Sequence, residues 1–207
     1  WEKMSLYPAG HYVRQIKVVP SVTIPQGWTA AVALDGLKQN GNTLTWDATT
    51  YEVLVDSPIF AGKYFRKWDL GQNVTLNVVA DKPEQLNAKP EHIEPHRHLV
   101  TEARIAFGAN HFDRYEFLLA LTDRMGGIGL EHHRSSENQN DPGYYIDWQG
   151  SLADHNLLPH ELVHSWNGKF HLEMAIWHAG HFGTWGRPEL LDRMLRWHLD
   201  HLPQARA

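Results

Sequence analysis

A pair of histidines in the stretch 158–164 (LPHELVH) constrains the local structure more than any other feature of the sequence. Residues four apart lie on one face of an α-helix, with Cβ atoms about 5–6 Å apart. His160 and His164 can therefore direct two imidazoles at one metal ion, and Glu161 can reach a water on that ion and take its proton. The spacing predicts a helix over about residues 151–166 that carries half of a zinc site, with both histidines as ligands and Glu161 as the catalytic base.

The residues around the two histidines favour a helix. Asp154 or Asn156 can cap its N-terminus, and apolar residues recur along the stretch. These apolar residues are Leu157, Leu158, Leu162, Val163 and Trp166. The alternative is a buried helix whose two histidines bind no metal and are satisfied by other groups.

Composition and charge exclude several classes of partner. The 207 residues fit one large domain or two small ones, and a hydrophobic content of 42% is ample for a core. A net charge of −5 gives no basic surface for nucleic acid. The sequence has no run of about 20 apolar residues, so we expect no membrane-spanning helix, and its first residues do not resemble a signal sequence. The absence of cysteine excludes disulfides and thiolate ligands and leaves the cell compartment open.

The first part of the chain has the pattern of an all-β domain. Short apolar runs alternate with turn formers such as Pro25-Gln26-Gly27 and Asn40-Gly41. Six runs read as strands: His11–Val19, Trp28–Leu34, Thr43–Trp46, Tyr51–Val55, Ala61–Trp68 and Asn73–Ala80. Their spacing predicts an antiparallel sheet or sandwich.

The pattern changes near Asp81-Lys82-Pro83. Apolar residues then recur at helical spacing, which predicts a helix from about His96 to Phe107. The apolar run Tyr115–Thr122 predicts a buried strand. A glycine-rich loop, Gly126–Gly129, leads into a polar extended segment. Such a segment can present a strand edge to an extended peptide, or it can be a tight turn with a solvated edge.

Four segments of the chain together resemble a known family. They are YEVLVDSP (51–58), FDRY (112–115), GGIGLEHHRSS (126–136) and HELVHSWNGK (160–169). In this order they resemble the glycyl-aminopeptidase family of PDZ-containing zinc metallopeptidases, over roughly residues 1–170. The resemblance implies an α+β fold, with an N-terminal antiparallel β-domain followed by the sheet and active-site helix of a partial thermolysin-like domain. It also implies zinc as the cofactor, a small peptide or amide as the substrate, and Glu131 as the residue that holds the substrate's amino group.

The resemblance ends after the histidine helix. Family members continue into a helical lobe with a third zinc ligand, a glutamate, and a tyrosine that stabilises the oxyanion, and then into a PDZ domain. From His171 onward the chain has none of these segments and only faintly resembles helical-barrel glycosidase-like proteins. We therefore expect three parts: a β-domain at 1–82, a partial catalytic domain at 83–170, and a helical tail at 171–207 that is foreign to the family.

The third zinc ligand has several candidates. A catalytic zinc ion usually has three protein ligands and a water. In this chain the third can come from the tail, or from another copy of the chain if the incomplete domain self-associates through exposed apolar surface. The candidates in the tail are His171, Glu173, His178 and His181.

The sequence as a whole favours a zinc-dependent hydrolase of peptide or amide bonds. Without the family's tyrosine, the oxyanion depends on the metal or on a histidine such as His132 or His133, so we expect weak and permissive activity. The alternative is a non-catalytic remnant that binds metal or other proteins. Carbohydrate chemistry, suggested by the tail, lacks a pair of carboxylates that we can place.

Overall fold

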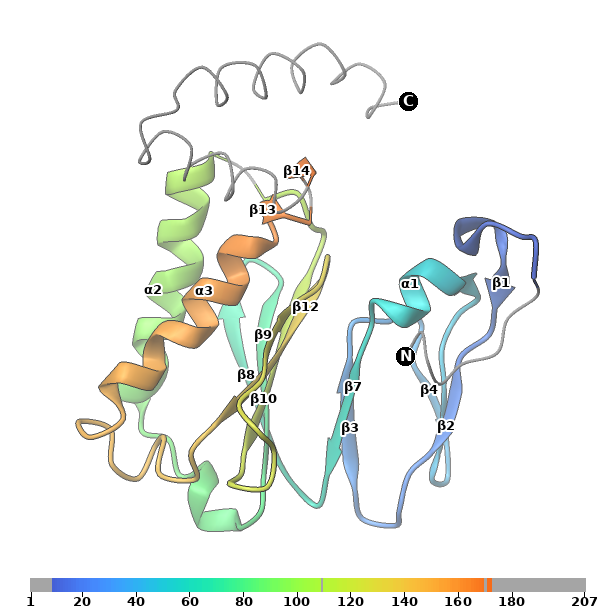
Figure 1. The fold of residues 1–207 in the computed structure, drawn as a ribbon. Helices are drawn as coiled ribbons and strands as arrows, with labels where there is room; N and C mark the ends of the chain where they lie inside the picture. The colour runs from blue at the N-terminus through green and yellow to red at the C-terminus, as the bar shows by residue number, and fades with distance from the viewer. Residues whose placement is uncertain (1–8, 109, 170, 173–207) are drawn as a thin grey trace, which may run out of the picture. The chain divides into compact units, whose positions relative to one another are not determined.

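The computed structural model describes residues 9–108, 110–169 and 171–172, and Figure 1 shows its fold. The chain divides into two units, Trp1–Ser165 and Trp166–Ala207. In the second unit, the described residues form β13 (Asn167–Gly168), which pairs with β14 (His171–Leu172). All other elements belong to the first unit, which is an α+β structure with several antiparallel strand pairs and few helices.

Short antiparallel strands fill the N-terminal part of the first unit, as the alternating pattern predicted. β1 pairs with β6, β2 and β4 both pair with β5, and β3 pairs with β7. Their apolar faces meet in a small core formed by Ile24, Leu34, Leu44 and Trp46. The strands are β1 (Lys17–Val18), β2 (Ser21–Thr23), β3 (Thr29–Val32), β4 (Lys38–Asn40), β5 (Thr43–Thr45), β6 (Thr49–Thr50) and β7 (Ile59–Gly62).

The predicted strand at Tyr51–Val55 is wrong, because this segment is the helix α1 (Tyr51–Val55). Thr50 caps the helix, since its side-chain oxygen accepts a hydrogen bond from the backbone N–H of Val53 at 3.2 Å. Glu52 lies in the first turn, where its negative charge interacts favourably with the positive N-terminal end of the helix dipole. Local capping therefore overrides the strand preference of this apolar run. The 3-10 helix η1 (Val13–Gln15) likewise interrupts the strand predicted from residue 11 to residue 19.

A five-stranded mixed sheet follows, in the order β11-β12-β10-β9-β8. Its central strand β10 runs parallel to β9 and β12, and every residue of β10 is buried. Burial on both faces explains this run, because helices cover one face (Figure 1) and the β3–β7 pair contacts the other. The predicted buried strand is thus confirmed. The strands are β8 (Tyr64–Gly71), β9 (Val74–Ala80), β10 (Tyr115–Leu121), β11 (Gly129–Glu131) and β12 (Ser135–Asn140).

Two helices lie against this sheet, α2 (Pro90–Phe107) on β8 and α3 (Leu157–His164) on β11 and β12. The predicted helix at 96–107 is present but begins six residues earlier. Pro90 is at the first helical position, where a missing N–H costs nothing, and Pro95 lies inside the helix. The predicted helix at 151–166 is shorter than expected, because its first part is the 3-10 helix η3 (Leu152–Asn156).

Residue 82, the predicted end of the β-domain, lies between β9 and the 3-10 helix η2 (Pro83–Leu86). Because β9 pairs with β10, the five-stranded sheet takes strands from both sides of this position. The predicted helical tail stays a prediction, since residues 173–207 lie outside the described part. Among the described residues, no helix has both the length and the apolar character needed to cross a membrane.

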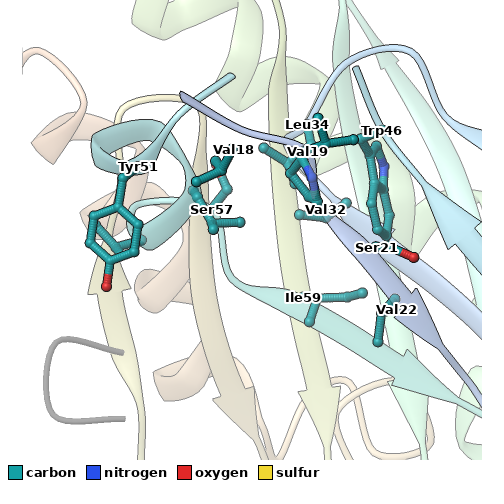
Figure 2. Close-up of a pocket in the computed structure, with 13 residues that line it drawn as sticks. Val18, Val19, Ser21, Val22, Val32, Leu34, Trp46, Tyr51, Ser57 and Ile59 are labelled. Carbon is teal, nitrogen blue, oxygen red and sulfur yellow. The ribbon is translucent and has the colours of Figure 1, made fainter. Parts of the chain in front are cut away.

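The N-terminal strands enclose an apolar cavity of about 560 Å³. Figure 2 shows Val22, Val32 and Ile59 around it, together with the ring of Trp46. Its wall is made by residues 18–22, by β3 and β7 and by α1, and it includes no residue of α3 or β11. This apolar cavity is therefore separate from the histidine helix.

Candidate metal centre

The two histidines of α3 lie as the spacing requires. The Nε2 atoms of His160 and His164 are 3.1 Å apart, and their rings are nearly perpendicular, with centroids 4.6 Å apart. His160 is exposed and His164 is half-buried. One turn of α3 therefore brings two ring nitrogens close together at the surface of the first unit.

This separation fits two ligands of one zinc ion. Tetrahedral zinc with Zn–N bonds of about 2.0–2.1 Å holds two nitrogens about 3.3 Å apart, close to the observed distance. A hydrogen bond between the two imidazoles is the alternative account of the same distance, with one ring donating to the other. The donor set, two imidazoles beside a carboxylate, suits zinc chemically.

Glu161 faces inward beside these rings. Only 4% of its surface is exposed, and its Oε2 is buried without a hydrogen-bond partner among the described residues. Burial is the main cause that raises the pKa of the Glu161 carboxyl, and the negative charge of Glu131 adds to it. The positive forms of His160 and His164 act in the opposite direction. A buried carboxylate oxygen without a partner is costly unless a ligand, ion or proton completes it.

Gly129 makes room for this carboxylate. A Cβ at position 129 would lie 2.7 Å from Cδ1 of Leu157, and closer still to Oε1 of Glu161. A glycine at position 129 therefore lets the backbone of β11 approach the side chains of α3 closely, as the glycine-rich loop predicted. Glu161 lies directly against the backbone of β11.

Glu131 is the last residue of β11 and is half-buried. β11 is an edge of the five-stranded sheet, and its pairing within the described chain is with β12. Because the charge of Glu131 acts on Glu161, the two carboxylates belong to one electrostatic site. The structure thus brings Glu131, Glu161, His160 and His164 into one region.

A third metal ligand is not found in the described part of the chain. Within residues 9–108, 110–169 and 171–172, no group of three or more His, Asp or Glu side chains is placed to hold a metal ion. The side chain of His171 and the residues Glu173, His178 and His181 lie outside what the structure describes. These four candidates therefore stay predictions.

The sequence did not identify two residues that support the site. The hydroxyl of Tyr115, on β10, donates to the backbone oxygen of Glu161 at 3.4 Å, and burial raises the pKa of this phenol. Asp56 accepts hydrogen bonds from His132 and His133. Alternation in the sequence cannot reveal a contact between residues 76 or 77 positions apart. Tyr115 could have been noticed, because its hydroxyl begins a run of buried residues and a buried hydroxyl needs a hydrogen-bond partner.

The comparisons with known proteins agree with this architecture. Residues 1–63 match the Peptidase M61 N-terminal domain. An aminopeptidase N family protein from Idiomarina loihiensis shares the fold, with a TM-score of 0.59 and 18% identity over 78% of this chain. Yeast LTA4 hydrolase in complex with bestatin follows, with a TM-score of 0.51 and 17% identity over 73% of this chain.

A third solved structure, an M1 zinc metallopeptidase from Deinococcus radiodurans, gives a TM-score of 0.42 and 14% identity over 72% of this chain. The chain spans 30%, 22% and 34% of the lengths of these three proteins, respectively. No curated protein sequence matches the chain. The fold is therefore like that of the aminopeptidase N family protein and of yeast LTA4 hydrolase, whereas the narrower glycyl-aminopeptidase assignment and the PDZ domain stay predictions.

Proposed function

We propose that this chain is part of a zinc-dependent hydrolase that cleaves peptide or amide bonds next to a free amino terminus. The observation that carries the proposal is the pair of Nε2 atoms of His160 and His164, 3.1 Å apart, beside the buried carboxylate of Glu161. The fold similarity to an aminopeptidase N family protein supports it. His160 and His164 would hold the metal.

Glu161 is the residue that moves the proton. Zinc, when bound, makes hydroxide available near neutral pH and polarises the scissile carbonyl. Because burial raises the pKa of its carboxyl, Glu161 holds a proton more readily near neutral pH than an exposed glutamate does. Its Oε2 takes a proton from the attacking water and returns it to the leaving nitrogen.

The edge strand β11 is the proposed binding site for the substrate. An extended peptide can pair with the open edge of a sheet, and β11 borders Glu161 through Gly129. Glu131, at the end of β11, would bind the substrate's ammonium group as an ion pair. Glu131→Gln should therefore weaken binding of a substrate with a free amino terminus and leave its N-acetylated counterpart unaffected.

The two histidines considered for the oxyanion, His132 and His133, are bonded to carboxylates. Both ring nitrogens of His132 are engaged, with Asp56 and Glu137, and Nδ1 of His133 is bonded to Asp56. Because both of its ring nitrogens are bonded, His132 is a poor candidate for donating to an oxyanion. Zinc, when bound, would stabilise the oxyanion, and small activated amides are the appropriate substrates for the test.

A non-catalytic metal-binding protein is the second candidate. Its support is the lack of a third ligand among the residues that the structure describes. Under this alternative His160 and His164 would bind a metal, or bond to each other, without turnover. Glu161 would then be a buried carboxylate with no role in chemistry.

Glu161→Gln separates the two candidates. The variant keeps the shape of the side chain and removes the base, so it should abolish hydrolysis of an aminoacyl-p-nitroanilide while zinc content is unchanged. Glu102→Gln, an exposed glutamate on α2, is the matched control and should behave as the wild type. Hydrolysis that persists in Glu161→Gln would exclude the proposed mechanism.

A further inference from the structure

The turn after Glu131 is hydrogen-bonded to two residues of the N-terminal region, Asp35 and Asp56. Three consecutive residues of this turn, His132, His133 and Arg134, bond to carboxylates of the segment that precedes β7. Arg134 donates to both oxygens of Asp35, at 2.8 and 3.1 Å. His132 and His133 both bond to Asp56. The turn that ends the proposed substrate edge is therefore held from outside its own sheet.

Asp56 makes three of these contacts. Its Oδ1 lies 3.2 Å from Nδ1 of His132, and its Oδ2 accepts from the backbone N–H of His133 at 2.9 Å and lies 2.8 Å from Nδ1 of the same residue. The side chain of Asp56 is 22% exposed. Asp56 directly follows α1 as its C-cap, and the Thr50 cap fixes the other end of that helix. Both carboxylate oxygens of Asp56 are thus hydrogen-bonded to residues of this turn.

His132 extends the connection to β12. Its Nε2 lies 3.2 Å from Oε1 of Glu137, and Glu137 is opposite Leu130 in the β11–β12 register. A neutral imidazole has one N–H, so both bonds are donated at once only by the imidazolium. Burial lowers the pKa of His132, but its hydrogen bonds with Asp56 and Glu137 outweigh burial and raise the pKa overall. Charge-assisted bonds of this kind are stronger than neutral ones.

β11 packs on α3, but its strand pairing in the described part of the chain is short. It pairs with β12 over three residues, from Gly129 to Glu131, and it is the edge strand of the sheet. The hydrogen bond from the backbone N–H of His132 to the oxygen of Ser135, at 2.9 Å, closes the ladder. A ladder this short frays easily unless its ends are fixed. The contacts of Asp56 lie directly beyond the end that carries Glu131.

We propose that Asp56 is a positioning residue, which sets the place of Glu131 and the β11 edge relative to Glu161 through His132 and His133. This inference rests on the proposed function for its effect on catalysis. The hydrogen bonds of Asp56 with His132 and His133, which hold the end of β11, do not depend on zinc. The N-terminal strands thereby have a direct role at the substrate edge.

Asp56→Asn tests the proposal in the full chain. The variant keeps the shape of the side chain but loses the negative charge that raises the pKa of His132. Because hydrogen bonds to charged groups are strong, their loss should make the amide exchange of residues 129–132 about 10–100-fold faster. Exchange in β10 should not change. Asp47→Asn is the matched control, because Asp47 is an exposed carboxylate of the same region whose ion pair with Lys38 is 3.3 Å long.

A kinetic measurement supplies the second readout. For an aminoacyl-p-nitroanilide with a free amino group, Asp56→Asn should raise KM about 10-fold or more while kcat stays as in the wild type. For the N-acetylated substrate, which lacks the ammonium group that Glu131 would bind, the rise in KM should be clearly smaller. A structural defect without a positioning role would instead lower kcat for both substrates.

The outcomes are separable. If amide exchange at 129–132 in Asp56→Asn equals that in Asp47→Asn, the proposal is overturned, whatever the kinetics show. Faster exchange with equal KM effects on both substrates overturns the positioning of Glu131. If the wild type hydrolyses neither substrate, the proposed function fails and exchange alone decides the anchoring. If Asp56→Asn accelerates exchange in β10 as well, His132→Gln takes its place, with the same expected change confined to residues 129–132.

Discussion

Glu161 and Gly129 are in contact because position 129 has no side chain. The carboxylate of Glu161 occupies the space that a Cβ would take, and Leu157 fills the remainder. The glycine-rich loop and the histidine helix, which are some 30 residues apart in the sequence, are therefore two sides of one site. Changes at either residue should be felt at the other.

Gly129→Ala should displace Glu161. Overpacking of this kind costs about 1–3 kcal/mol, and a shift of a catalytic group on the order of 1 Å lowers the rate by about 10²-fold. Gly126→Ala is the control, because a Cβ there meets no atom within 4 Å. Urea unfolding and steady-state kinetics of both variants measure the effect. Equal behaviour of the two alanine variants would show that the contact is unimportant.

Tyr115→Phe should lower stability modestly. The hydroxyl donates to the backbone oxygen of Glu161, at 3.4 Å, inside a fully buried environment. Removal of one such hydrogen bond lowers the free energy of unfolding by about 1 kcal/mol. Tyr12→Phe, at a position that is 75% exposed, should leave the stability unchanged. A Tyr115→Phe protein as stable as the Tyr12→Phe control would mean that β10 does not hold α3 through this bond.

The buried His96 of α2 should make the protein acid-labile. His96 is 3% exposed, and burial, with a smaller contribution from His155, lowers its pKa from 6.5 to about 4. Because the unfolded chain binds this proton more readily, the stabilising contribution is complete above pH 6.5 and is lost as the pH falls toward 4. The loss is about 3 kcal/mol.

Urea unfolding at several pH values measures this loss. His96→Gln should flatten the pH dependence between 6.5 and 4, because it removes the group that titrates. His98→Gln, at an exposed position on the same helix, should retain it. If the His96→Gln protein lost stability with acid as steeply as the wild type, another group would be responsible.

Parts of this structure follow from the sequence because their signals are local. His160 and His164 need only one turn of helix to meet, and the apolar run of β10 needs only two covered faces. α1 was missed because YEVLV has strand composition and its helix depends on the cap at Thr50. The start of α2 was misplaced because Pro95 reads as a helix start, although Pro90 occupies that position.

The environment of the site could not be predicted in the same way. The bonds of Asp56 with His132 and His133 join residues 76 and 77 positions apart, and no periodicity encodes such a contact. The buried state of Glu161 likewise depends on β11 packing against α3. Sequence spacing predicts which residues form the proposed site, whereas tertiary contacts determine the burial of Glu161 and the pKa of its carboxyl.

Metal binding by the two histidines is the central claim, and the zinc content of the full chain tests it most directly. Protein dialysed against zinc and then against metal-free buffer should retain an equimolar amount, and the variant with both His160→Ala and His164→Ala should retain none. His98→Ala, at an exposed position on α2, should bind zinc as the wild type does. A wild-type chain that stays metal-free under saturating zinc, or a double variant that retains as much zinc as the wild type, would contradict the account.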